Sequence, residues 1–158
     1  MRMLLIILMV CHSMISLAQN ETLYKPDADA KKDIKAAVKT AGKENKHVLI
    51  QAGGNWCKWC LEFARFAKED REIDSLIKKS FVWYHLNYNK EQKNEDLFKK
   101  YRNPQRFGYP VFIILDKKGN LLHTQNSEYL EDGGKSYDKR KVLSFLKMWT
   151  PEALEPLK

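Results

Sequence analysis

The sequence contains little cysteine, with three such residues among 158. A small scaffold held together by several disulfides is therefore excluded, and cysteine is expected to serve local chemistry instead. Polar low-complexity sequence is also missing, because 44% of the residues are hydrophobic and only 30% are charged. These proportions exclude a disordered or fibrous chain, and the length predicts a single globular domain.

No hydrophobic run is long enough to cross a membrane comfortably, since such a span needs about 20 mostly apolar residues. Residues 1–18 join a basic start, an apolar run over 3–10 and a small-residue end at Ala18. This pattern is typical of a secretory signal peptide, with an uncleaved anchor as the weaker alternative. It predicts cleavage after Ala18, a domain over residues 19–158, and a periplasmic or secreted location.

A lipid anchor on Cys11 is a further alternative. Bacterial lipoproteins carry a small residue directly before the modified cysteine, whereas this chain has Val10 there, so lipidation is disfavoured. Removal of the signal peptide would leave two cysteines, Cys57 and Cys60, in a compartment that permits disulfides.

Beyond the signal peptide, hydrophobic residues alternate between helical and strand-like spacing. Helices are expected at residues 29–41, 57–68, 71–79 and 91–101 and around the apolar set Val142, Phe145, Leu146 and Trp149, and strands at residues 47–52, 81–88, 111–115 and 120–124. Residues 125–138 are expected to form one long loop. The order predicts an α/β fold with a mixed central β-sheet, helices on both faces and a hairpin between the last two strands.

The chemistry is concentrated in the sequence Trp56-Cys57-Lys58-Trp59-Cys60. Two cysteines three positions apart at the start of a helix lie on nearly the same face, close enough to form a disulfide with little movement. The free N–H groups and the dipole of the first helical turn favour a thiolate at Cys57. We therefore predict that Cys57 is the nucleophile and that Cys60, one turn deeper, is the resolving thiol.

This motif resembles that of the thioredoxin-like family, in particular the secreted or periplasmic branch that includes the C-terminal domain of the membrane thiol-disulfide interchange proteins. The resemblance also rests on the strand and turn over residues 48–56, the aromatic strand from Phe81, the sequence Gly108-Tyr109-Pro110 and the hairpin at residues 118–120. It implies a cis Pro110 beside the cysteines and a Tyr109 backbone that pairs with the substrate. Trp56, directly before the nucleophile, is expected to face the substrate.

Two positions depart from the family pattern. Lys58 and Trp59 stand between the cysteines where ordinary thioredoxins have Gly-Pro, which leaves the redox potential open. Gln51 aligns with the family's buried acid, and an amide cannot act as a general base near neutral pH. Glu62 is a weak substitute, because its place on the helix points it away from Cys60.

Other interpretations of the cysteine pair and of the basic charge agree less well with the sequence. A structural zinc site needs four Cys or His ligands, and the remaining histidines, His47, His85 and His123, fall on separate predicted strands, where they are expected to be hydrogen-bonded structural residues. A purely structural disulfide across so short a loop would constrain the unfolded chain little. The net charge of +8 comes from lysines interspersed with acids, as on solvated helices, and no nucleic-acid-binding motif is present.

The sequence therefore predicts a monomeric thiol-disulfide oxidoreductase that acts on protein thiols and disulfides and exchanges electrons with an upstream redox partner. No organic cofactor, metal, nucleic acid or stable membrane span is expected. The alternative is a non-catalytic thioredoxin-like binding module, or a chaperone in which the cysteines hold a soft ion such as Cu(I).

Overall fold

The computed structural model describes residues 22–155, so the predicted signal peptide lies outside the described residues. The main elements are α1 (Ala30–Glu44), β1 (His47–Gly53), α2 (Lys58–Glu69), α3 (Arg71–Ser80), β2 (Phe81–Asn87), α4 (Glu95–Lys100), β3 (Val111–Leu115), β4 (Leu121–Asn126) and α5 (Lys139–Met148). Short 3-10 helices cover Pro104–Phe107, Ser127–Leu130 and Glu152–Leu154.

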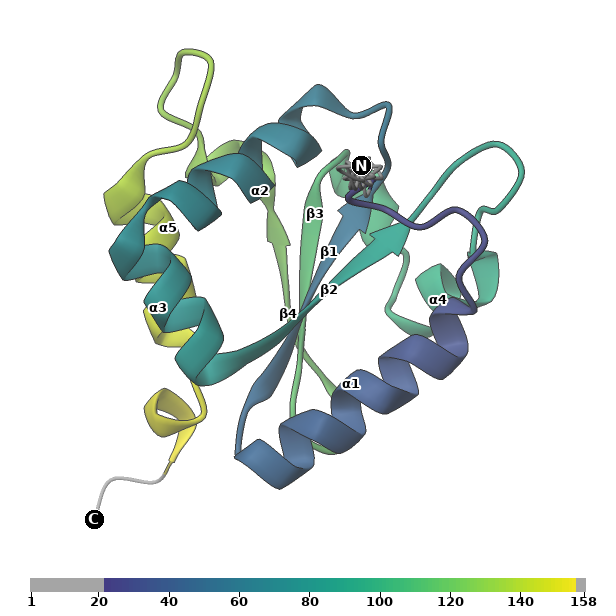
Figure 1. The fold of residues 1–158 in the computed structure, drawn as a ribbon, viewed down its shortest axis with the longest axis horizontal. Helices are drawn as coiled ribbons and strands as arrows, with labels where there is room; N and C mark the ends of the chain where they lie inside the picture. The colour runs from purple at the N-terminus through teal and green to yellow at the C-terminus, as the bar shows by residue number, and fades with distance from the viewer. Residues whose placement is uncertain (1–21, 156–158) are drawn as a thin grey trace, which may run out of the picture.

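The four strands form one mixed sheet in the order β2-β1-β3-β4. Strands β1 and β2 are parallel, with α2 and α3 making the crossover between them, and β3 is antiparallel to both β1 and β4. Helices α1 and α4 cover one face of the sheet, and α2, α3 and α5 cover the other (Figure 1). The predicted α/β architecture, with a mixed sheet between two helical layers, is confirmed.

Alternate residues of the central strands pack into two separate hydrophobic cores, one on each face of the sheet. Val48 and Ile50 point toward the α1 side, whereas Leu49, between them, points toward the side of α2, α3 and α5. Strand β3 divides in the same way, and all five of its residues are buried. Because both faces of the sheet are covered, β1 and β3 lack the alternating polar residues of a half-exposed sheet.

Acidic side chains mark where three of the helices begin. The carboxylates of Asp29, Asp70 and Asp138 accept hydrogen bonds from backbone N–H groups in the first turns of α1, α3 and α5. Such caps satisfy donors that have no partner within the helix. The Asp70 cap also explains why the chain turns between α2 and α3 instead of continuing as one helix.

The structure corrects the fourth predicted helix and the long loop. Helix α4 is limited to Glu95–Lys100, because Asn94 adopts a left-handed conformation with φ of 50° and its side-chain amide donates to the Asn87 carbonyl. The interval predicted as loop 125–138 contains the end of β4, the 3-10 helix at Ser127–Leu130 and an isolated bridge between Glu131 and Tyr137. The loop is therefore largely structured.

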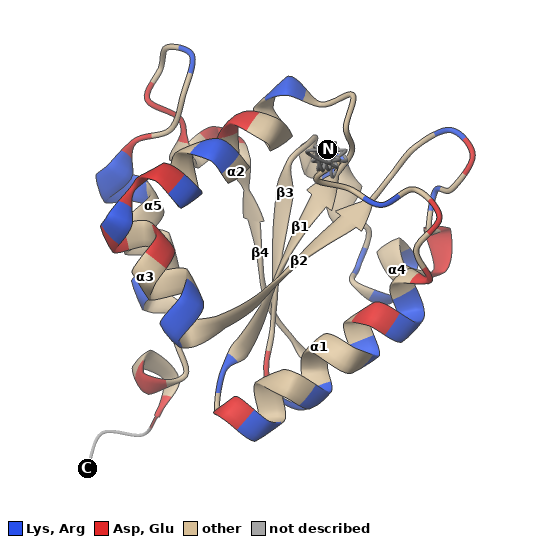
Figure 2. Ribbon diagram, in the orientation of Figure 1, with Lys and Arg blue, Asp and Glu red and all other residues tan. Residues whose placement is uncertain are grey.

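Charged side chains lie mainly on the helices and connecting loops, whereas the strands are almost free of them (Figure 2). Lysine and arginine alternate with acidic residues along the helices, as the sequence predicts for solvated faces. Among residues 22–155, none of the helices has the length and apolar character needed to span a bilayer.

Candidate active site

The candidate site lies where β1 ends and the chain turns into α2. Two glycines are required here because neighbouring side chains come very close to their Cα atoms. A Cβ at Gly53 would come within 2.3 Å of the Cys60 Sγ, and one at Gly54 within 2.4 Å of the Trp56 Nε1. Both distances are far below van der Waals contact, so larger residues at these positions would displace the cysteine and the tryptophan.

Cys57 and Cys60 form a disulfide, with their Cα atoms 5.2 Å apart. Cys57 is the N-cap of α2 and not a first-turn residue as the sequence suggests, and its Sγ accepts a hydrogen bond from the Cys60 N–H at 3.1 Å. The sulfur of Cys57 therefore lies at the N-terminal end of α2 with a backbone N–H pointing at it, which favours a negative charge there. Cys57 is 6% exposed and Cys60 is completely buried, so Cys57 is the more accessible of two largely covered residues.

An aromatic rim borders the disulfide. Trp56 is 58% exposed, and its indole N–H donates to the Tyr88 carbonyl at 2.8 Å, which fixes the ring over the end of β2. Tyr109 meets Trp56 edge-to-face and stacks on Tyr88. A pocket of about 440 Å³ is lined by Trp56 together with Tyr88, Asn89, Lys90, Glu91 and Lys93.

Pro110 is buried directly before β3, and the Tyr109–Pro110 peptide bond is cis, as the resemblance implies. The next residue, Val111, pairs with Ala52 at the end of β1, so the proline lies beside the turn that carries the cysteines. Tyr109 packs on the cluster that contains Cys57 and Cys60. The structure thus brings the sequence-predicted residues Trp56, Cys57, Cys60, Tyr109 and Pro110 into one region.

A buried polar layer lies beneath the disulfide. Gln51, which has no exposed surface, donates from its Nε2 to the Tyr24 hydroxyl at 2.9 Å and to the Cys60 carbonyl at 2.8 Å. Tyr24 is fully buried and belongs to the same cluster of buried residues as both cysteines. Burial raises the pKa of its hydroxyl, against the opposing effect of the Gln51 hydrogen bond, so the phenol is protonated at neutral pH.

Sequence reasoning missed Tyr24. It precedes the first helix in a short segment without helical or strand periodicity, and nothing nearby in the sequence links it to the cysteines. The link is made by Asn55, whose side-chain amide pairs with both the N–H and the carbonyl of Tyr24, at 3.0 and 2.8 Å. An asparagine in the turn before a Cys-x-x-Cys motif is the one available signal, and it does not identify its partner.

The histidines are strand or strand-end residues, as predicted, but they are not all hydrogen-bonded. The His47 Nδ1 lies 2.8 Å from the Trp149 carbonyl, and the His123 Nε2 lies 3.1 Å from the Gln125 side chain. His85 is the exception, because its buried Nε2 has no hydrogen-bond partner. Burial, assisted by the charge of Lys68, lowers the pKa of His85 to about 4, so this ring is neutral at physiological pH.

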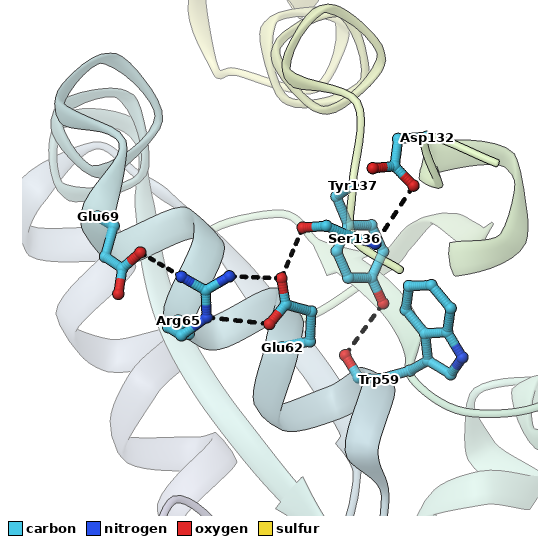
Figure 3. Close-up of polar contacts among 7 residues, drawn as sticks. All are labelled: Trp59, Glu62, Arg65, Glu69, Asp132, Ser136 and Tyr137. Carbon is cyan, nitrogen blue, oxygen red and sulfur yellow. Dashed lines mark hydrogen bonds and ion pairs between the residues drawn. The ribbon is translucent and has the colours of Figure 1, made fainter. Parts of the chain in front are cut away.

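Glu62 faces away from the cysteines, as predicted. Its carboxylate accepts hydrogen bonds from Arg65 and from the Ser136 hydroxyl, and these two contacts, with Arg65 the larger, lower its pKa (Figure 3). The Tyr137 hydroxyl donates to the Trp59 carbonyl at 3.1 Å. Figure 3 shows how these contacts fasten the first turns of α2 to the segment before α5, which holds the helix that carries Cys60.

Within residues 22–155, no group of three or more His, Cys, Asp or Glu side chains is arranged to hold a metal ion. The sulfurs of the disulfide do not titrate, so the ionisable groups beside them are phenols and a neutral imidazole. The disulfide can be broken and re-formed, and the phenols can donate hydrogen bonds around it.

Comparison with known proteins gives a consistent assignment. Residues 29–117 match the model of a protein family described as thioredoxin-like. No curated protein is similar enough to the sequence to count as a relative.

Solved structures share the fold at low sequence identity. A disulphide isomerase from Xylella fastidiosa Temecula1 superposes with a TM-score of 0.68 and 22% identity, over 78% of this chain and 93% of that one. The oxidised C-terminal domain of DsbD from Neisseria meningitidis gives 0.55 and 18%, over 75% and 95%. A thioredoxin from Thermus thermophilus gives 0.53 and 19%, over 72% and 81%. These likenesses establish the thioredoxin-like fold.

Proposed function

Because the chain belongs to the thioredoxin-like family, we propose that it is a thiol-disulfide oxidoreductase that acts on the thiols and disulfides of other proteins. The observation that carries the proposal is the Cys57–Cys60 disulfide at the N-terminal end of α2, beside the exposed ring of Trp56. The similarity in fold to a disulphide isomerase and to the DsbD C-terminal domain supports it.

In the reducing direction, the Cys57 thiolate attacks one sulfur of a partner's disulfide. That disulfide breaks, its second sulfur leaves as a thiolate that takes a proton from water, and a mixed disulfide joins Cys57 to the partner. The Cys60 thiolate, having given its proton to water, then attacks the Cys57 sulfur. The partner leaves as its second thiol, two electrons have passed to it, and the Cys57–Cys60 disulfide is formed.

The two cysteines suit these different steps. The Cys57 sulfur lies at the helix cap and is the less buried of the two, which favours attack on an external disulfide. Cys60 is completely buried, and its Cα lies 5.2 Å from that of Cys57. It can therefore resolve the mixed disulfide without movement of the helix.

The rim supplies a surface for the partner. Trp56 and Tyr109 border the disulfide, and the pocket lined by Trp56 joins the aromatic surface of Tyr88 to the charges of Lys90 and Lys93. We expect an extended partner segment to lie across Trp56 and to pair with the backbone at Tyr109, next to the cis proline. A dithiol protein in the periplasm or secreted space would return electrons to the disulfide after each cycle.

The test is insulin reduction with a dithiol donor, using the full chain. The wild type should accelerate reduction, Cys60→Ser should accumulate a mixed disulfide with an insulin chain, and Cys57→Ser should form none, because only Cys57 attacks. Cys11→Ser is the matched control and should behave as the wild type. Equal trapping by both motif variants would contradict the division of roles.

The alternative function makes a different prediction in the same experiment. A binding module or Cu(I) chaperone would leave insulin intact while the reduced wild type bound Cu(I) through both sulfurs. Measuring the equilibrium of the Cys57–Cys60 pair against glutathione then separates a reductase from an oxidase, because the ratio of oxidised to reduced protein reports the redox potential directly.

A further inference from the structure

The N-terminal segment contributes one side chain to the interior of the site. Tyr24 lies at the start of the described residues, 33 positions before Cys57 in the sequence, yet it belongs to the cluster of buried residues that contains both cysteines. Its backbone is held at two points by the Asn55 side chain, which belongs to the turn leading into Cys57. A tyrosine anchored in this way is placed relative to the cysteines and not merely packed in a core.

The Tyr24 hydroxyl and the sulfur of Cys60 both lie beside Gly53. Both atoms approach the same point above Gly53, since a Cβ there would be 2.3 Å from the Cys60 Sγ and 2.9 Å from the Tyr24 hydroxyl oxygen. The two atoms are therefore no farther apart than the sum of these distances. Gly53 itself places no side chain between them.

The hydrogen-bond pattern fixes which way the hydroxyl proton can point. The Cys60 carbonyl can only accept, so the Gln51 atom that faces it must be the amide nitrogen. The same nitrogen donates its second hydrogen to the Tyr24 oxygen. The proton of Tyr24 therefore points away from Gln51 and is available to another acceptor.

We propose that the Tyr24 hydroxyl donates this proton in a hydrogen bond to the Cys60 thiolate when the disulfide is opened, and so promotes release of the partner protein from Cys57. The inference rests on the proposed exchange function. The phenol remains protonated throughout: Cys60 gives its proton to water, and Tyr24 only lowers the free energy of the resulting thiolate. The bond that then forms joins Cys60 to Cys57, and the bond that breaks joins Cys57 to the partner.

The described residues place several titratable groups around Cys60. Tyr109 packs on the cluster of Tyr24, Cys57 and Cys60. The His85 ring meets the Tyr24 ring edge-to-face and is neutral above its pKa of about 4, with Lys68 farther out. The Tyr137 hydroxyl is occupied by the Trp59 carbonyl, and Glu62 is occupied by Arg65 and Ser136.

A hydrogen bond to a charged group typically changes the equilibrium for forming it by about tenfold. Losing the Tyr24 hydroxyl should therefore raise the pKa of Cys60 by about 1. The thiolate fraction below this pKa falls about tenfold, but each thiolate becomes about threefold more nucleophilic, because thiol reactivity rises with basicity. In Tyr24→Phe, release of the partner should thus be about threefold slower than in the wild type at low pH and about threefold faster once Cys60 is fully ionised.

The experiment compares Tyr24→Phe with the wild type in the full chain, with Cys11→Ser in every variant so that only the motif thiols titrate. In a Cys57→Ala background, the ultraviolet absorbance of the Cys60 thiolate is followed against pH. In the intact motif, the reduced protein is mixed with an aromatic disulfide whose released thiolate is coloured. The first release reports attack by Cys57, and the second reports resolution by Cys60.

The expected result is a higher Cys60 pKa in Tyr24→Phe, an unchanged first release, and second-release profiles that cross between wild type and variant as the pH rises. Tyr101→Phe is the matched control, since Tyr101 is also buried, in the core on the α1 side, and its hydroxyl has no hydrogen-bond partner among the described residues. This variant should change neither the Cys60 titration nor the two release rates. Asn55→Ala, which frees the Tyr24 backbone but keeps the phenol, should shift the Cys60 pKa in the same direction by a smaller amount.

An unchanged Cys60 titration in both Tyr24→Phe and Asn55→Ala would overturn the proposal. Slower release with parallel pH profiles would also overturn it, because that pattern indicates a loosened site and not a lost hydrogen bond. Failure of the exchange function itself would look different. It would appear as absent insulin reduction by the wild type, whereas the Cys60 titration in the Cys57→Ala background does not require exchange with any protein.

Discussion

Replacing Gln51 by glutamate tests how firmly the layer under the disulfide is built for an amide. Gln51 is completely buried, and its nitrogen donates two hydrogen bonds, to Tyr24 and to the Cys60 carbonyl. A protonated glutamic acid has nearly the same shape but can donate only one. At acidic pH, the Gln51→Glu variant should therefore lose about 1 kcal/mol in free energy of unfolding, the net value of one hydrogen bond.

The loss should grow with pH because burial disfavours the charged carboxylate. A buried glutamate has its pKa raised by about 3 above the unfolded value of about 4.3. Below pH ~4.3 both the folded and unfolded states hold the proton, so no further cost arises. As the pH rises toward the folded-state pKa, only the unfolded state releases its proton, and stability falls by about 1.4 kcal/mol per pH unit, up to about 4 kcal/mol. This figure is an upper bound, since the Tyr24 hydroxyl can turn and donate to the new carboxylate.

The assay is urea unfolding of the oxidised protein at several pH values between about 5 and 8. Ala36→Glu places the same carboxylate at an exposed position on α1 and should show no comparable pH dependence. Gln51→Met removes both donated hydrogen bonds without adding a charge, so it should be destabilised by a nearly constant amount. A Gln51→Glu stability difference that stays flat from acid to neutral pH would refute the reasoning, because it would mean that water or a proton donor reaches position 51.

Two further predictions concern the rest of the core. Burial lowers the pKa of His85 to about 4, below its unfolded value of about 6.5. As the pH drops through this interval the unfolded state binds the proton first, so the free energy of unfolding should fall by about 3 kcal/mol. The His85→Phe variant should lack this part of the pH dependence in the same urea titration. Phe63 is fully buried and packs on Trp83, Phe112 and Tyr137, so Phe63→Ala should cost about 3–5 kcal/mol in thermal or urea unfolding. Phe107→Ala, at a 37% exposed ring, should cost less than about 1 kcal/mol, and equal losses would show that Phe63 is not a central core residue.

The elements that the sequence predicts well are those with strong local signals. Helix α3 and strand β3 match their predicted intervals almost residue for residue, because an Asp70 cap and an uninterrupted apolar run define them. Helix α1 continues to Glu44, past its predicted end at residue 41, because the left-handed cap conformation is adopted by Asn45 and not by Gly42. Either residue can terminate a helix, so the choice depends on packing that the local sequence does not show.

In the candidate site, too, only the residues with a strong local signal are predicted from the sequence. Cys57, Cys60, Trp56, Tyr109 and Pro110 carry a recognisable spacing, and the structure places them together. The layer beneath them depends on contacts between residues far apart in the chain. Tyr24 reaches Gln51 across 27 positions and Asn55 across 31, and no periodicity or spacing relates these residues. The polar residues that surround Cys60 could therefore be identified only from the three-dimensional structure.

Strand β3 has a sequence prone to aggregation, and its central position in the sheet normally keeps it buried. Val111–Leu115 is an uncharged run of β-branched, aromatic and aliphatic residues, all buried between β1 and β4. Exposed in a partly unfolded chain, such a segment is prone to pair with copies of itself and aggregate. It is bracketed by Pro110, which cannot donate a strand hydrogen bond, and by Asp116 and Lys117, whose charges oppose stacking. The proline beside the disulfide thus also limits self-association of the strand that follows it.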